Sequence, residues 1–267
     1  LLRPKFLPIV ASNTLALALL RKANGRIDGF VVEGSTAGGH NAPPRGKPEQ
    51  NGAGEPIYGE RDKVDLRKMR ELGLPFWLAG GYGSAEKLRE ALAAGAVGVQ
   101  VGTAFAFCAE SDLRADYKQA LLKKALCGEA KVFTDSSASP TGYPFKVAQL
   151  KGTLSEPEVY LARPRICDLG YLREPFRTAA GTIDYRCGAQ PVSIYLSKGG
   201  KIEDTVGRIC LCNALVANVG HPQVHAGKYI ETGLVTSGDD LSEIPSFLPP
   251  DTPDYSAADV IAKLLDA

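Results

Sequence analysis

The chain has 267 residues, of which 44% are hydrophobic, and a formal net charge of +1. This composition is typical of a globular protein that is large enough to bury a sizeable core. The near-zero net charge does not favour binding to nucleic acid or to a membrane surface, and six cysteines in a chain this long do not indicate a disulfide-stapled secreted scaffold. We therefore expect a cytoplasmic protein with no nucleic acid and no membrane as partners.

The first half of the chain alternates predicted strands and helices. Strands are predicted over residues 6–11, 28–32, 75–79 and 97–101, and helices over residues 14–22, 62–72, 85–94 and 114–126. This alternation is typical of right-handed βαβ units in a parallel sheet. Four strands are half of an eight-stranded barrel, so we expect the C-terminal half of a (β/α)8 TIM barrel in a chain that is the carboxyl-terminal portion of a longer protein. A smaller open sheet is the alternative.

The character of the sequence changes after Gly128. We predict two domains, a partial (β/α) barrel over residues 1–130 and a C-terminal extension over residues 131–267. The extension is expected to be α-rich or irregular and to contain a cysteine-containing subdomain. Its turn-rich loop near residues 134–146 is either a plain surface loop or a loop near a substrate entrance, with Tyr143 as a substrate contact.

Two successive predicted strands end in glycine turns. The third strand stops at Gly80-Gly81 and the fourth at Gly102-Thr103, and Ser84 is suited to cap the helix between them. Backbone N–H groups at this edge of a parallel sheet, beside a helix N-terminus, can hold a phosphate, and glycine allows the close approach. The sequence therefore predicts a phosphate site, to which Thr103 adds a hydroxyl donor.

A long polar loop follows the second predicted strand and runs from Glu33 to about Tyr58. Loops of this length inside a compact domain are usually functional or disordered. His40 comes directly after Ala-Gly-Gly, just past the end of the strand. It is either a solvent-exposed loop histidine or a residue held over a ligand at the carboxyl face of the barrel, where it can accept or donate a proton.

Residues 31–40, Val-Val-Glu-Gly-Ser-Thr-Ala-Gly-Gly-His, resemble the Glu-Gly-x-x-Ala-Gly-Gly-His signature of the nitronate monooxygenase family, formerly called 2-nitropropane dioxygenases. Residues 79–81 and 94–105 resemble the segment that binds the FMN phosphate in that family. The resemblance covers roughly residues 6–111. It implies an FMN-dependent (β/α)8 barrel, with the FMN site in residues 1–130, that oxidises alkyl nitronates with molecular oxygen.

The resemblance also implies roles for individual residues. His40 would be the catalytic base. The residues implied to bind the cofactor are Ala37, Gly38, Gly39, Gly80, Gly81, Gln100, Val101, Gly102 and Thr103. Some family members contact the flavin through a lysine near the end of the strand before the signature, where this chain has Ser12.

The implied partners are a small-molecule substrate and molecular oxygen. Unpaired strand edges in a half-barrel also favour a homo-oligomer. The missing strands would supply the other wall of the flavin site, so we expect the 267-residue chain to purify colourless or substoichiometric in flavin. Two other functions stay open. One is an FMN-dependent enoyl-acyl-carrier-protein reductase that uses NAD(P)H, and the other is an inactive half-barrel kept as a scaffold.

Four of the six cysteines lie in the C-terminal extension, at positions 167, 187, 210 and 212. Four thiolates can form a metal site, but only Cys210-x-Cys212 approaches the usual ligand spacing. We therefore predict reduced, packed cysteines and no metal, and the role of these four residues stays open.

Overall fold

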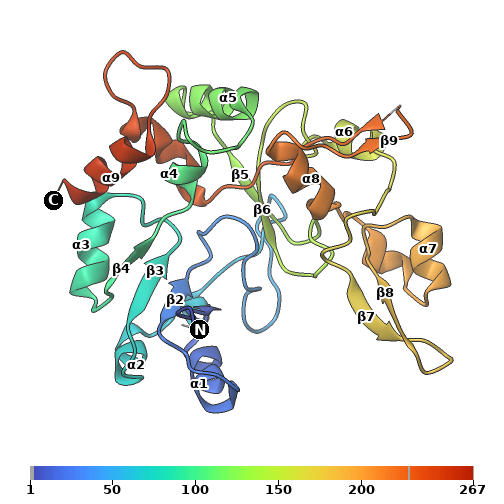
Figure 1. The fold of residues 1–267 in the computed structure, drawn as a ribbon, viewed down its shortest axis with the longest axis horizontal. Coiled ribbons are helices and arrows are strands. Elements are labelled where there is room, and N and C mark those ends of the chain that lie inside the picture. The colour runs from blue at the N-terminus through green and yellow to red at the C-terminus, as the bar shows by residue number, and fades with distance from the viewer. Residues whose placement is uncertain (1–2, 228, 267) are drawn as a thin grey trace.

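The computed structural model describes residues 3–227 and 229–266. Its first half is an α/β unit built on a parallel sheet with strand order β1-β2-β3-β4 (Figure 1). The strands are β1 (Ile9–Val10), β2 (Phe30–Glu33), β3 (Phe76–Ala79) and β4 (Gly98–Gln100). Helices α1 (Asn13–Lys22), α2 (Leu66–Glu71) and α3 (Ala85–Ala93) connect them in turn. The predicted parallel sheet with alternating helices is confirmed.

The second helix is shorter than residues 62–72, the span that the apolar periodicity predicts. It begins at Leu66 because the Asp65 side chain accepts hydrogen bonds from the backbone N–H groups of Arg67 and Lys68 and caps it there. A separate 3-10 turn, η1 (Glu60–Asp62), precedes it. The long loop after β2 contains no helix or strand before η1 among the described residues, as predicted.

The third helix has the predicted ends. The Ser84 hydroxyl accepts from the N–H of Lys87, and Gly95 follows the helix with φ +92°. Two neighbouring apolar side chains of this helix differ in burial. Ala91 is fully buried in the core around the sheet, whereas Leu92 is 49% exposed. Because Ala91 alone meets the sheet closely, the helix lies near the strands without burying Leu92.

A second core joins the middle of the chain to its C-terminal end. It contains α4 (Thr103–Ala106) and α5 (Ala115–Leu126), which pack with the 3-10 helix η3 (Asp239–Phe247) and with α9 (Ala257–Leu265). In Figure 1, α9 lies beside α3 and α4. This hydrophobic core therefore crosses the expected domain boundary between residues 130 and 131.

The C-terminal extension was expected to be α-rich or irregular, and this expectation is wrong for three strand pairs. They form two-stranded antiparallel sheets that pair β5 (Val132–Asp135) with β6 (Phe145–Ala148), β7 (Glu174–Arg177) with β8 (Ile183–Arg186) and β9 (Val224–His225) with β10 (Tyr229–Ile230). Strands of two to four residues are too short to show a clear alternation of apolar and polar side chains.

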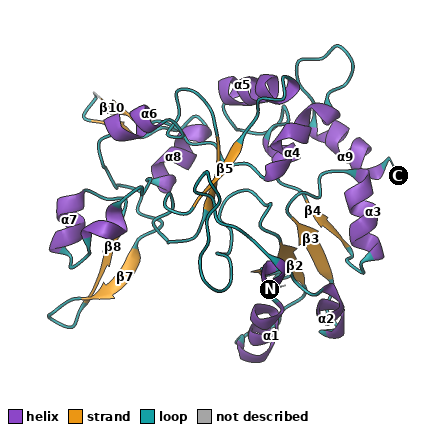
Figure 2. Cartoon of the chain, turned by 180° about the vertical axis from the view of Figure 1, so that it is seen from behind, coloured by secondary structure: helices purple, strands orange, loops and turns teal. Residues whose placement is uncertain are grey.

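Helices α6 (Pro157–Ala162), α7 (Val192–Ser197) and α8 (Leu211–Asn218) and the 3-10 helix η2 (Ile202–Thr205) connect these hairpins. The β7–β8 hairpin lies at the opposite end of the molecule from the parallel sheet (Figure 2). In the part of the chain that the structure describes, no helix has the length and apolar character needed to cross a bilayer.

Candidate functional site

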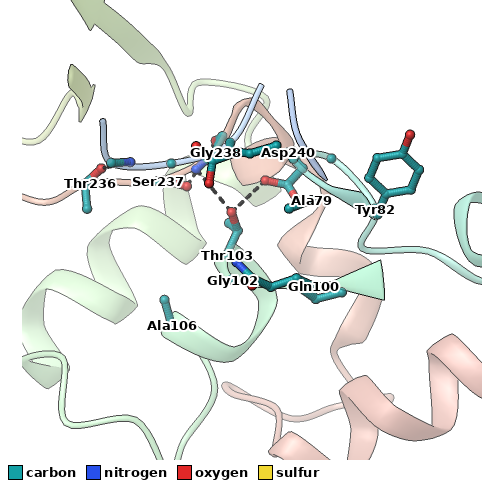
Figure 3. Close-up of a pocket in the computed structure, with 17 residues that line it drawn as sticks. Ala79, Tyr82, Gln100, Gly102, Thr103, Ala106, Thr236, Ser237, Gly238 and Asp240 are labelled. Atoms are coloured by element: carbon teal, nitrogen blue, oxygen red, sulfur yellow. Dashed lines mark hydrogen bonds between the residues drawn. The ribbon is translucent and has the colours of Figure 1, made fainter. Parts of the chain in front are cut away.

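The carboxyl ends of β2, β3 and β4 open onto one cavity of about 280 Å³. All nine residues for which the sequence implies cofactor binding line it, namely Ala37, Gly38, Gly39, Gly80, Gly81, Gln100, Val101, Gly102 and Thr103. Thr236, Ser237, Gly238 and Asp240 complete the wall from the start of η3 (Figure 3). The cavity thus combines the two glycine turns, the loop after β2 and a segment more than 130 residues further along the chain.

Glycine is required at Gly80 and Gly38 because backbones meet there. Gly80 has φ +93°, and a Cβ on it would lie 2.9 Å from the backbone nitrogen of Ala37. A Cβ on Gly38 would lie 2.8 Å from the backbone nitrogen of Gly238. The loop after β2 is therefore held between the turn after β3 and the segment that leads into η3.

Several residues that line the cavity have backbone N–H groups that make no loop or turn hydrogen bond within the described ranges. The N–H groups of Gly80, Gly81 and Gly102 donate none of the loop and turn hydrogen bonds found within residues 3–227 and 229–266. The N–H of Thr103, at the first position of α4, also has no partner in its helix. These groups are available to an anion that enters the cavity.

The Thr103 side chain, in contrast, is already engaged. Its hydroxyl donates to Asp240 Oδ1 at 2.6 Å, and its Oγ1 accepts from the N–H of Gly238 at 3.1 Å (Figure 3). A hydroxyl has a single hydrogen, so this arrangement leaves none for a phosphate. In this geometry the hydroxyl ties α4 to η3, and the expectation that Thr103 offers a hydroxyl donor to a phosphate stays a prediction.

The side chains that line the cavity include two carboxylates, Glu33 and Asp240, and no lysine or arginine is found among the described lining residues. Burial raises the pKa of both carboxyl groups, and the hydrogen bond from Thr103 opposes this shift at Asp240. An anion in the cavity would therefore depend on backbone N–H groups, and it would favour the protonated form of Asp240.

His40 does not line this cavity. Its Nε2 lies 2.6 Å from Ser139 Oγ, and its ring meets the Phe145 ring edge-on with 4.9 Å between centroids. The backbone is fixed on either side, since the Lys146 N–H donates to Gly39 and the Asn41 N–H donates to Pro144, each at 2.9 Å. Burial lowers the pKa of His40, so the imidazole is neutral near pH 7 and can accept a proton.

Sequence reasoning did not identify two residues of this region. Ser139 is completely buried and hydrogen-bonds both His40 and Thr141, whereas Tyr143, the residue singled out in the same loop, is 51% exposed. Asp240 was missed because nothing in the sequence links it to the glycine turns. The only local signal was the small polar run that surrounds Gly238.

A buried lysine holds the segment that carries Asp240. Lys146, on β6, is 3% exposed, and its Nζ donates to Asp239 Oδ1 at 2.7 Å and to Thr134 Oγ1 at 2.8 Å. This pair fixes the start of η3 against the β5–β6 hairpin. Ser12, which stands near the position of the lysine found in some family members, instead caps α1 by accepting from the N–H of Leu15.

The structure also brings together the four cysteines of the C-terminal extension. Cys187 and Cys210 are buried, and Cys167 and Cys212 pack against them. All four are free thiols. Within the described ranges, no three His, Cys, Asp or Glu side chains are grouped so that they could hold a metal ion.

Comparison with known proteins supports a relationship over the first half of the chain. A family model described as nitronate monooxygenase matches residues 5–143. The nitronate monooxygenase of Pseudomonas aeruginosa is 35% identical over 140 residues, which are 51% of this chain and 37% of that protein. The probable nitronate monooxygenase of Bacillus subtilis is 35% identical over 120 residues, 43% of this chain and 31% of that protein. The matched region therefore spans about a third of the length of these curated relatives.

A solved structure resembles almost the whole chain in fold. The structure of FabK from Thermotoga maritima matches with a TM-score of 0.52 at 20% sequence identity, and the match covers 98% of this chain and 60% of that one. This likeness supports the fold alone. The family model covers more than half of the chain, including the Ala-Gly-Gly-His segment and both glycine turns that line the cavity. The chain belongs to the nitronate monooxygenase family.

Proposed function

We propose that this chain supplies the phosphate-binding side of an FMN site in a flavin oxidoreductase that oxidises alkyl nitronates with molecular oxygen. One observation carries the proposal: the two glycine turns and the Ala-Gly-Gly segment, all within the family match, line a single cavity. We further infer that the four βα units are half of a (β/α)8 barrel, in which ligands bind at the carboxyl ends of the strands.

The cavity fits the phosphate end of FMN. The free N–H groups of Gly80, Gly81, Gly102 and Thr103 would donate to the phosphate oxygens, and the first three of these residues have no Cβ to obstruct it. The absence of a cationic side chain from the described lining means that binding would rely on these dipoles. When bound, the flavin would supply the redox chemistry, and the protein would orient it and limit side reactions.

His40 would act as the base for one class of substrate. A nitronate is already deprotonated and needs no base, whereas a neutral nitroalkane must first lose a proton from carbon. The imidazole is neutral, and its Nε2 is oriented by Ser139. It can take up that proton if the substrate either displaces the serine hydroxyl or approaches Nε2 beside it. Ser139 would therefore position the base.

The experiment that tests the proposal is a flavin titration of the 267-residue chain. Quenching of flavin fluorescence is followed for FMN and, separately, for riboflavin, which lacks the phosphate. We expect FMN to bind at least tenfold more tightly than riboflavin, because the backbone donors contact only the phosphate. Equal affinities for FMN and riboflavin would refute a phosphate site here.

A second measurement separates the activities within the flavin oxidoreductases. The chain reconstituted with FMN is mixed anaerobically with an alkyl nitronate or with NADPH, and bleaching of the flavin absorbance is followed. Bleaching by the nitronate but not by NADPH is expected. Rapid bleaching by NADPH would instead favour the enoyl-acyl-carrier-protein reductase, and bleaching by neither would favour the non-catalytic scaffold.

A further inference from the structure

Four cysteine side chains gather near the base of the β7–β8 hairpin. Cys187 directly follows β8 and is 5% exposed, and Cys210 directly precedes α8 and is 4% exposed. Cys167 and Cys212 pack against them and are half-buried. The fold therefore brings thiols from three separate stretches of sequence into one small core, although they are not arranged as metal ligands.

Two of these thiols flank the same hairpin. Cys167 packs against the small buried cluster that contains Cys187. Cys167 precedes β7 and Cys187 follows β8, so the pair closes the open end of this hairpin. A bond between the two sulfur atoms would link segments that the antiparallel pairing of β7 and β8 already brings together.

An arginine reaches Cys167 across a glycine. Gly170 has φ +67°, and a Cβ on it would lie only 2.1 Å from Arg173 Nε, so the guanidinium crosses directly over the backbone of this residue. Arg173 Nη2 also donates to the carbonyl oxygen of Asp168 at 3.5 Å. From this position the charge of the guanidinium helps to lower the pKa of Cys167. The absence of a side chain at Gly170 thus provides the space that places a positive charge beside the thiol.

The two thiols differ in how easily they ionise. The hydrogen bond from Cys187, followed by the charge of Arg173, lowers the pKa of Cys167 to about 6. The hydrogen bond to Cys167 and burial raise the pKa of Cys187. Near pH 7, Cys167 is therefore mostly the nucleophilic thiolate, while Cys187 keeps its proton.

We propose that Cys167 and Cys187 are a reversible redox pair, in which Cys167 reacts with hydrogen peroxide and Cys187 resolves the product to a disulfide. In the first step the Cys167 sulfur attacks one peroxide oxygen. An S–O bond forms, the O–O bond breaks, and the departing hydroxide takes a proton to become water. Cys167 is then a sulfenic acid.

In the second step the Cys187 sulfur attacks the Cys167 sulfur. The S–S bond forms, the S–O bond breaks, and the hydroxide leaves as water with the proton from Cys187. In total the two thiols lose two electrons and two protons, and one peroxide is reduced to two molecules of water. A thiol reductant reverses the change by reducing the disulfide.

The chain offers an internal reference for the rate. Cys127 is an exposed thiol at the end of α5, far along the sequence from the cluster. At pH 7 a pKa near 6 leaves about nine-tenths of Cys167 as thiolate, against about one-hundredth for a thiol at the ordinary value of 9.0. The lower basicity makes each thiolate roughly 20-fold less nucleophilic, so Cys167 should react about fourfold faster than an ordinary thiol.

The test uses the reduced 267-residue chain and peptide mapping by mass spectrometry. A short pulse of iodoacetamide at pH 7 should label Cys167 about fourfold faster than Cys127, although Cys127 is the more exposed. Treatment with hydrogen peroxide should then yield a peptide cross-linked between Cys167 and Cys187, which a thiol reductant separates.

Three variants define the roles of the residues. Arg173→Gln should slow labelling of Cys167 but leave it faster than labelling of Cys127, because the guanidinium is lost while Cys187 remains beside it. Arg177→Gln on the same hairpin, where the guanidinium bonds Gly181, is the matched control and should leave the rate unchanged. In Cys187→Ser the oxidation should stop at the sulfenic acid of Cys167, which dimedone traps.

The labelling rates and the disulfide found in the unmodified chain are sufficient to test the proposal, even if a variant does not fold. Slower labelling of Cys167 than of Cys127, or a disulfide that joins other cysteines, would overturn it. Zinc or iron bound at one equivalent per chain and removed only when the four thiols are modified would also overturn it, because the cluster would then be a metal site.

Discussion

Replacing Gly80 by alanine tests how the cavity is built. Gly80 has φ +93°, and an added Cβ would lie 2.9 Å from both the Ala37 nitrogen and Thr36 Oγ1. Gly54 is the matched control, because it has φ +89° and nothing within 4 Å of an added Cβ. In both variants alanine must adopt a left-handed backbone conformation, which costs about 1–2 kcal/mol. In both, alanine also lowers the conformational entropy of the unfolded chain by the same amount.

The difference between the two variants isolates the close approach of backbones. Overpacking against a fixed backbone costs about 1–3 kcal/mol, so Gly80→Ala should be less stable than Gly54→Ala by that amount. Urea unfolding at 25 °C measures the difference. Gly80→Ala should also lose FMN binding in the flavin titration, whereas Gly54→Ala should keep it. Equal stability of the two variants, or undiminished FMN binding by Gly80→Ala, would refute this description of the cavity.

Three further substitutions test other parts of the region. Asp240→Asn should tighten FMN binding at pH 8 because the charge of Asp240 repels the phosphate. Since burial raises the pKa of Asp240, this advantage over the unmodified chain should shrink as the pH falls and Asp240 becomes protonated. An identical pH dependence of FMN fluorescence titrations for the two proteins would contradict this. His40→Ala, reconstituted with FMN, should oxidise a neutral nitroalkane at least 100-fold more slowly than the unmodified protein, as measured by oxygen consumption. It should oxidise the preformed nitronate at a rate similar to that of the unmodified protein. Equal losses of rate with both substrates would argue against His40 as a base. Lys146→Met should lower the free energy of unfolding, measured in urea, by about 1–3 kcal/mol, since it leaves Asp239 and Thr134 without their donor. An effect below about 0.5 kcal/mol would show that the bonds of this buried lysine do little for stability.

The parts of the fold that the sequence predicted well depend on local signals. Ser84 marks the start of α3 correctly because capping is a property of a few neighbouring residues. The C-terminal end of the strand before Gly80 is also predicted to the residue, since a short apolar run stops abruptly at glycine. Local chemistry of this kind can be read without knowledge of the tertiary structure.

The parts that the sequence did not predict depend on distant contacts. Leu92 matches the apolar period of α3, yet it is exposed because only the Ala91 side of the helix meets the sheet. The Thr103 hydroxyl was assigned to a ligand because its partner, Asp240, lies 137 residues away in the chain. The candidate base was predicted from its neighbours, but its hydrogen-bond partner Ser139 lies 99 residues away. No periodicity connects such pairs.

The wall formed by residues 236–240 has a consequence for the order in which the cavity can form during synthesis. The glycine turns at residues 80 and 102 emerge early, but Gly238, which packs against Gly38 and donates to Thr103, emerges more than 130 residues later. Until then the turns lack their cover, and the apolar core that joins α5 to η3 and α9 is incomplete. Cofactor capture by a nascent chain would therefore have to wait until residues 236–240 have emerged and closed this side of the cavity.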